Sequence, residues 1–280
     1  MTTSIPATTV FDWTTVAGAW DTHRAHVETM KEQVSSDLLS RLDLQPGERV
    51  LELGAGTGEF ALQLAGAVGP TGHVIASDVA PGMVALLRTT LADAENVQVE
   101  QLDALDTRLP SGSVDAVVMR MGLMLVDDPQ AVLRECRRLL APGGRLAVAV
   151  WAAPQHNPWL LYVGMAAQLN GVVTGGPPTG PGGIFSLADP AVLEGIASEA
   201  GFNDVVIHEV PTVATFATSD EYVDTVASLA GPLSAAIAGA SEETRAAMRT
   251  TAADLAQAHR TPGGLVLAGR ALVCTATAPG

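Results

Sequence analysis

Short apolar runs alternate with segments of helical periodicity through most of this chain, from about position 45 onward. Strands are expected at 49–53, 73–77, 97–101, 114–119 and 145–150, with helices at 59–68, 81–93 and 129–140. The strands are mostly apolar and have helices between them. This pattern predicts an α/β fold with a parallel sheet covered on both faces.

The flanking segments have different patterns. Residues 20–42 place apolar side chains at three- and four-residue spacing, which predicts an amphipathic helix: Val27, Met30, Val34, Leu38 and Leu42. Nine of the thirteen residues in 171–183 are Gly or Pro, which predicts a loop that acts as a mobile lid or is a passive insertion. Helical patterns at 190–200, 219–229 and 241–259 and strands at 205–216 and 265–275 follow.

The composition and charge of the chain indicate which classes of binding partner to expect. The 280 residues carry a net charge of −15, which disfavours nucleic acid and anionic membrane surfaces and favours a small-molecule partner. No apolar run has the length of a membrane span, and the first residues do not form a signal peptide pattern. The two cysteines lie far apart in sequence, so we expect a reduced, cytoplasmic protein without a metal site. A homodimer is one option for its assembly, and the sequence leaves the oligomeric state open.

A glycine-rich stretch, V-L-E-L-G-A-G-T-G, follows the first expected strand. Gly54, Gly56 and Gly58 allow positive φ angles and let a ligand approach the backbone and the following helix N-terminus. The stretch departs from the dinucleotide fingerprint G-x-G-x-x-G because residue 59 is Glu, which disfavours a nicotinamide-dependent dehydrogenase.

Two acidic residues follow the next two strands. Asp78, about twenty residues after the glycines, is placed to accept hydrogen bonds from ribose hydroxyls; the alternative is a cap for the helix that begins at 81. Asp103, after the third strand, is placed to accept from an adenine amine; the alternative is a solvated loop residue.

Five ordered motifs resemble those of the class I S-adenosylmethionine-dependent methyltransferases. They are V-L-E-L-G-A-G-T-G, V-I-A-S-D-V-A-P-G-M, V-E-Q-L-D-A-L, L-P-S-G-S-V-D-A-V-V-M-R and L-R-E-C-R-R-L-L-A-P-G-G-R-L-A-V. The chain is most similar to the small-molecule group that includes quinone-biosynthesis and natural-product enzymes. The resemblance implies a doubly wound, Rossmann-like, seven-stranded mixed sheet of order 3-2-1-4-5-7-6 with a helical cap, and S-adenosylmethionine as cofactor.

The resemblance also implies a set of cofactor contacts. Glu52 and the backbone of Gly54, Ala55 and Gly56 would surround the methionine part, and Asp78 the ribose. Val79 and Met83 would pack on the adenine, and Asp103 and Ala104 would recognise the edge of the adenine. The backbone at Arg120 and Met121 would contact the amino group of the cofactor's methionine part, and Trp20 would close over that part.

The expected organisation has five parts. These are a flexible tail (1–18), a cap helix region (19–44), a cofactor-binding core (45–151), a lid over the substrate (152–188) and C-terminal helices with the last two strands (189–280).

The candidates for a general base are His23, on the expected cap helix, and His156, just after the fifth strand. The alternative for each is a polar residue without a catalytic role. A possible apolar substrate wall, with ordinary core as the alternative, consists of Met119, Met121, Met124, Leu125, Trp151 and Trp159. The side chain of Arg120 could hold an anionic substrate group or pair with an acidic neighbour.

The chain is therefore expected to transfer a methyl group to O, C or N of an apolar, cyclic small molecule. Orientation of the two partners would be the main source of rate. Two alternatives stay open: a cofactor-binding cyclase that transfers no methyl group, and a non-catalytic ligand-binding protein.

Overall fold

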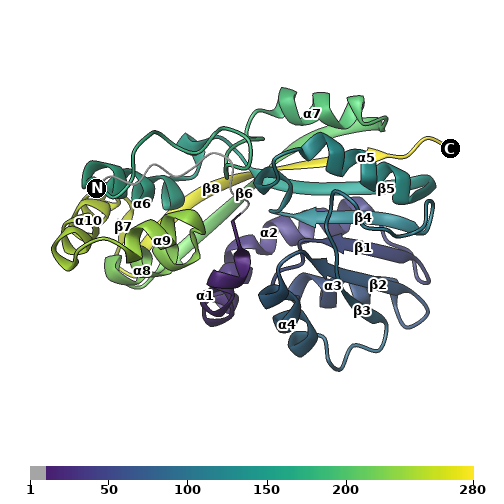
Figure 1. Cartoon of the computed structure of the whole chain (residues 1–280), viewed down its shortest axis with the longest axis horizontal. Helices are drawn as coiled ribbons and strands as arrows, with labels where there is room; N and C mark the ends of the chain where they lie inside the picture. The colour runs from purple at the N-terminus through teal and green to yellow at the C-terminus, as the bar shows by residue number, and fades with distance from the viewer. Residues whose placement is uncertain (1–10) are drawn as a thin grey trace.

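The five core strands form a parallel sheet in the computed structural model, which describes residues 11–280 (Figure 1). Their bounds are β1 (Arg49–Leu53), β2 (His73–Asp78), β3 (Val97–Gln101), β4 (Val114–Arg120) and β5 (Leu140–Trp151). β1 lies in the centre, with Glu52 beside Ala76 of β2 and Val118 of β4. The carboxyl ends of these strands therefore meet at one edge, with the glycine stretch at its middle.

Two long strands complete the sheet: β6 (Asn203–Phe216) and β8 (Gly264–Thr277). β8 lies between β5 and β6 and is antiparallel to both, so the expected order 3-2-1-4-5-7-6 is confirmed as β3-β2-β1-β4-β5-β8-β6. An additional two-residue strand, β7 (Arg260–Thr261), pairs with the start of β8. β5 pairs with β8 only as far as Ala271, and beyond it β6 and β8 continue as a two-stranded ribbon.

Helices cover the sheet and surround the ribbon (Figure 1). α2 packs against α3, β5, β8 and β6, α5 packs against α7, and α6 packs against α8 and α10. The helices are η1 (Trp13–Val16), α1 (Ala17–Thr22), α2 (Arg24–Leu42), α3 (Glu59–Val68), α4 (Pro81–Thr90), η2 (Leu123–Leu125), α5 (Pro129–Leu139), η3 (Pro154–His156), α6 (Pro158–Leu169), α7 (Pro190–Glu199), α8 (Ser219–Leu229), α9 (Pro232–Ala238), α10 (Glu242–Leu255) and η4 (Gln257–His259).

The apolar face predicted for the cap helix is buried. All five expected core positions of α2 are at most 7% exposed, and Val34 and Leu38 are fully buried against the sheet. Burial of such a side chain stabilises the fold by about 1.5–3 kcal/mol. Packing on the sheet therefore holds α2 in place, and α2 in turn carries the polar residues described below.

The N-terminal region differs from the expectation. The expected helix over 20–42 is divided at His23, where the backbone leaves helical geometry (φ −100°, ψ 12°). Residues 1–10 of the expected tail lie outside the described residues, but residues 13–18 are helical. Asp12 accepts a hydrogen bond from the Thr14 N–H at 3.0 Å and so caps η1. The cap therefore includes more of the N-terminal segment than the sequence pattern indicates.

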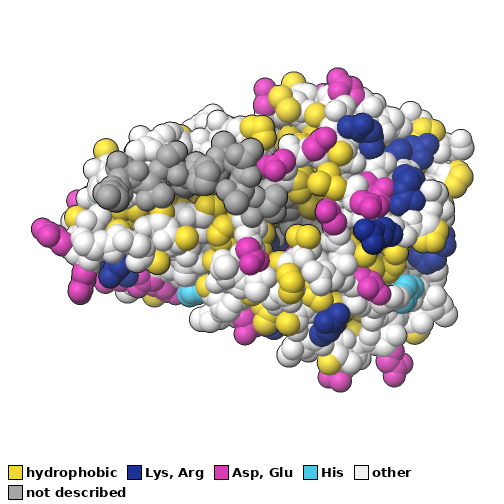
Figure 2. All heavy atoms as spheres, viewed as in Figure 1, with side chains coloured by type: hydrophobic (Ala, Val, Ile, Leu, Met, Phe, Trp, Pro, Cys, Tyr) yellow, Lys and Arg dark blue, Asp and Glu magenta, His cyan; other side chains and the backbone are white. Residues whose placement is uncertain are grey.

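The surface mixes both signs of charge. On the face drawn in Figure 2, acidic side chains lie at both ends of the molecule, and Lys and Arg side chains are interspersed among them over the core sheet. Within residues 11–280, no helix has both the length and the apolar character needed to cross a membrane.

Candidate functional site

The glycine stretch forms a tight turn between β1 and α3. Gly54, Gly56 and Gly58 have φ angles of +66°, +60° and +97°, a region that side chains other than glycine rarely adopt. The Ala55 N–H donates to the Ser77 carbonyl at 2.8 Å, which ties the turn to β2. A Cβ at Gly56 would meet no atom within 4 Å, so the backbone there faces open space that a ligand can occupy.

Asp78 lies beside this turn at the end of β2. Its Oδ2 accepts from the Gly56 N–H at 3.2 Å and its Oδ1 from the Ala80 N–H at 2.9 Å. Burial raises the pKa of the carboxyl, and the backbone donors of Ala80 and Gly56 lower it. The N-cap of α4 is Ala80 and no side chain caps it, so the capping alternative for Asp78 does not describe this structure. Each carboxylate oxygen has one backbone donor and keeps a lone pair for a ligand hydroxyl.

Glu52 is buried below the turn, with 1% of its surface exposed. Burial is the main cause that raises its pKa to about 8, and Arg120 acts in the opposite direction. Its Oε2 atom has no hydrogen-bond partner. A buried carboxyl group without a partner is costly, which indicates that a polar ligand or water contacts it.

Arg120 ends β4 and makes contacts mainly with α2. Its guanidinium donates to both carboxylate oxygens of Glu28, at 2.7 and 2.8 Å, and to Ser35 Oγ at 2.7 Å. The guanidinium carbon lies 4.8 Å from the ring centre of Phe60. Of the two alternatives for this side chain, the structure shows the salt bridge to an acidic neighbour.

Met121 follows Arg120 and has a left-handed backbone, with φ of +65°. Such a conformation is strained for a residue other than glycine and is frequent at functional sites. The Met121 N–H donates to the Ala149 carbonyl at 2.9 Å. This N–H is therefore already bonded within the sheet, and the contact predicted here for a ligand ammonium group requires carbonyl oxygens.

The other predicted cofactor residues surround the same edge. Trp20 and Met83 pack together with Ala17 and Ala80, so the N-terminal helices cover the start of α4. Val79 is half exposed, Asp103 is exposed, and Ala104 is half-buried. Asp103 Oδ1 accepts from the Leu105 N–H at 2.9 Å. The structure thus brings the predicted residues to one edge of the sheet, and their roles stay predictions.

Three buried polar atoms at this junction lack a hydrogen-bond partner among the described residues. They belong to Trp20 (Nε1), Glu52 (Oε2) and Glu59 (Oε1). One is a donor and two are acceptors. Such a combination is expected where a ligand with both donors and acceptors is bound.

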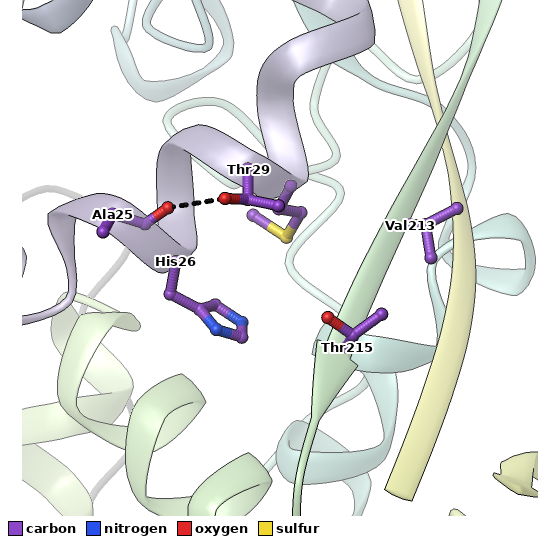
Figure 3. A pocket seen from close by; sticks show the side chains of 6 residues that line it. Ala25, His26, Thr29, Val213 and Thr215 are labelled. Carbon is purple, nitrogen blue, oxygen red and sulfur yellow. Dashed lines mark hydrogen bonds between the residues drawn. The ribbon is translucent and has the colours of Figure 1, made fainter. Parts of the chain in front are cut away.

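Neither predicted base lines the groove that the structure shows between α2 and β6. His23 lies at the junction of α1 and α2, and His156 lies in η3. A groove of about 290 Å³ between α2 and β6 is lined instead by His26, Met30 and Val213, with Ala25, Thr29 and Thr215 (Figure 3).

His26, which the sequence analysis does not single out, stacks on Phe216 with ring centres 4.6 Å apart. Burial is the main cause that lowers the pKa of His26, and its Nε2 has no hydrogen-bond partner. The signal in the sequence is its position next to the core residue Val27 on the predicted cap helix.

The expected apolar wall is largely core. Met119, Met124, Trp151 and Trp159 are at most 7% exposed, and the two tryptophan rings contact each other edge to face at 5.1 Å. Residues 11–280 contain no group of three or more His, Cys, Asp or Glu side chains that could hold a metal ion.

Comparisons with known proteins agree with this geometry. A family model described as a methyltransferase domain matches residues 50–144, about a third of the chain. The ubiquinone/menaquinone biosynthesis C-methyltransferase UbiE of Ectopseudomonas mendocina is 39% identical over 123 residues, which are 43% of this chain and 48% of that protein. The chain thus spans about half the length of this curated relative.

Solved structures share the fold. A SAM-dependent methyltransferase from Aquifex aeolicus superposes with a TM-score of 0.54 at 23% identity, covering 71% of this chain and 93% of that one. The [4+2]-cyclase SpnF superposes with a TM-score of 0.57 at 19% identity, covering 99% of both chains. The matched domain at residues 50–144, the sheet order and the five motifs together are similar to those of the class I S-adenosylmethionine-dependent methyltransferases.

Proposed function

We propose that this protein transfers a methyl group from S-adenosylmethionine to a carbon, nitrogen or oxygen atom of an apolar small molecule. The observation that carries the proposal is the arrangement around the glycine turn. There Gly56 offers open backbone, Asp78 keeps lone pairs, and Glu52 is buried without a full set of partners.

The residues present fit this cofactor. Asp78 would accept hydrogen bonds from the ribose hydroxyls, and the unpartnered Glu52 oxygen would accept one from the ammonium group of the methionine part. The exposed Val79 and Asp103 would contact the adenine. When bound, the cofactor supplies a methyl group activated by its sulfonium, so the protein has mainly to hold the acceptor in line with it.

The acceptor would bind above the carboxyl ends of β4 and β5. Met121 and Leu125 are half-buried there, after β4. The segment after the Gly/Pro loop reaches the same place, because Ser186 Oγ donates to the Met124 carbonyl at 2.7 Å. The Gly/Pro loop and the residues that follow it are therefore suited to act as a lid, whereas α6, which also belongs to the expected lid region 152–188, packs against α8 and α10. His23 and His156 stay the candidates for a base if the acceptor must lose a proton.

Calorimetric titration with S-adenosylmethionine and S-adenosylhomocysteine tests the cofactor site. Micromolar binding of both is expected, and candidate acceptors should then gain the mass of one methylene on turnover. A folded protein, free of co-purified ligand, that binds neither compound would contradict the proposal and favour the non-catalytic alternative.

A second candidate is a cyclase that binds the cofactor but transfers no methyl group. This candidate is supported by the likeness in fold to the [4+2]-cyclase SpnF, which extends over 99% of both chains. Product mass separates the two, because cyclisation leaves the acceptor mass unchanged.

A further inference from the structure

Four charged side chains meet where α2 crosses the ends of β1 and β4: Glu28, Lys31, Glu52 and Arg120, here named the cap cluster. Arg120 and Glu28 form a bidentate pair that neutralises both charges. The guanidinium also donates to Ser35 Oγ and lies over the Phe60 ring. Arg120 therefore uses three of its five N–H donors within the fold, and its charge is compensated by Glu28.

Lys31 is the only lysine of the chain, which otherwise uses fourteen arginines. It is 7% exposed, and its Nζ lies 3.1 Å from Glu28 Oε1 and 5.7 Å from the centre of the Trp20 ring. Lys31 and Arg120 share the single Glu28 carboxylate, so two buried cations have one adjacent anion between them. Burial and the nearby Arg120 lower the pKa of Lys31 to about 8.

Glu52, in the same cluster, lacks a hydrogen-bonding partner among residues 11–280 for one of its carboxyl oxygens. It is a buried carboxyl with an unpartnered Oε2, and burial raises its pKa to about 8. The cluster thus holds one ammonium group and one carboxyl group whose burial is incompletely compensated. A ligand with a carboxylate and an ammonium on the same carbon atom would compensate both.

We propose that Lys31 binds the carboxylate of the cofactor's methionine part, while Glu52 binds its ammonium group and Arg120 remains paired with Glu28. The unpartnered Trp20 Nε1 is a second donor at the same junction. This inference rests on the proposed function, because it deepens the cofactor site described there.

The groove at His26 is a separate place. Successive residues of an α-helix are 100° apart, so Glu28, Lys31 and Ser35 share one side of α2 while Ala25 and Thr29, which line the groove, lie on the other. The two charges of an amino-acid group are therefore met by the cap cluster and not by the groove.

Calorimetry with two ligands tests the proposal. S-adenosylhomocysteine is compared with its analogue that lacks only the α-carboxylate, on wild type and on Lys31→Met, which keeps an apolar stem of similar length. Wild type should prefer the carboxylate ligand roughly 10- to 150-fold, the strength of one hydrogen bond between charged groups. Lys31→Met should lose most of this preference and bind the analogue within about threefold of wild type.

Arg41→Met is the matched control. It removes one positive charge from the last turn of the same helix, where Arg41 pairs with Asp37 at 2.7 Å. It should keep the wild-type preference. If Lys31→Met weakens the binding of both ligands equally, or keeps the wild-type preference for the carboxylate ligand, the role of Lys31 is overturned and the proposed function is not affected. Failure of wild type to bind either ligand would overturn the proposed function and this inference together.

The single lysine allows a test on the unmodified sequence. Protein labelled with ¹³C at lysine Cε should give one side-chain signal, whose pH titration reports Lys31 directly. Bound S-adenosylhomocysteine should raise the titration midpoint by one unit or more, and the analogue without the carboxylate should not. A midpoint that saturating S-adenosylhomocysteine leaves unchanged would overturn the proposal even if Lys31→Met fails to fold.

Discussion

Replacement of Asp78 by asparagine is the sharpest perturbation of the proposed cofactor site. The carboxylate accepts one backbone N–H on each oxygen, from Gly56 at 3.2 Å and from Ala80 at 2.9 Å. Asparagine has nearly the same shape but carries one acceptor oxygen and one donor amide. It therefore removes the charge and at least one of the two expected ribose hydrogen bonds.

The expected losses of cofactor affinity and of stability follow from these contacts. A hydrogen bond to a charged group contributes about 1.5–3 kcal/mol, so loss of one should weaken binding roughly 10- to 150-fold. Loss of one backbone contact should lower the free energy of unfolding by only about 1 kcal/mol. Asp78→Asn should therefore lose much of its affinity for the cofactor and keep most of its free energy of unfolding.

Two assays check this expectation. Titration calorimetry with S-adenosylhomocysteine gives the affinity, and urea unfolding without ligand gives the stability. Asp93→Asn is the matched control, since it removes the same charge from an exposed position near the end of the helix that follows Asp78. If wild type binds and Asp78→Asn binds within twofold of it, the ribose assignment is refuted.

Three further predictions concern the cluster and the loop. Arg120→Met should lower the free energy of unfolding by about 3–5 kcal/mol, because it leaves the Glu28 carboxylate without its bidentate partner; a loss below about 1 kcal/mol in urea unfolding would contradict this. The pKa of Glu52 is raised to about 8 in the folded state from 4.5, so the folded state holds an extra proton and stability should fall as pH rises from about 4.5 to 8. Urea unfolding of Glu52→Gln over this range should show a flatter pH profile, and an equal slope would refute the linkage. Shortening the 171–183 loop should change turnover or acceptor KM and leave calorimetric cofactor affinity nearly intact; no change in any of the three would identify a passive insertion.

The local pattern of apolar and polar residues is sufficient to predict most strands and helices of the core. The bounds expected for β1, α3 and β3 match the structure residue for residue. β1 is a buried apolar run, and the Gly turn separates it from α3. β3 is a partly buried edge strand, and its alternating valines identify it. The sequence pattern does not predict α6, because its residues follow a segment rich in Trp, Pro, His and Asn and its apolar face packs against α8, α10 and β8, which are distant in the chain. The order of the last strands came from family resemblance, because periodicity contains no information on which strands are neighbours.

The amino-acid sequence by itself determined the strands, the glycine turn and the position of Asp78, all of which depend on residues close together in the chain. Only the tertiary structure decided the partners of Arg120 and the surroundings of Lys31 and Glu52. Arg120 and Glu28 are 92 positions apart, and they meet because α2 packs its apolar face across the strand ends. The charge of a buried side chain depends on which charges and how much water surround it, and those neighbours exist only once the chain has folded.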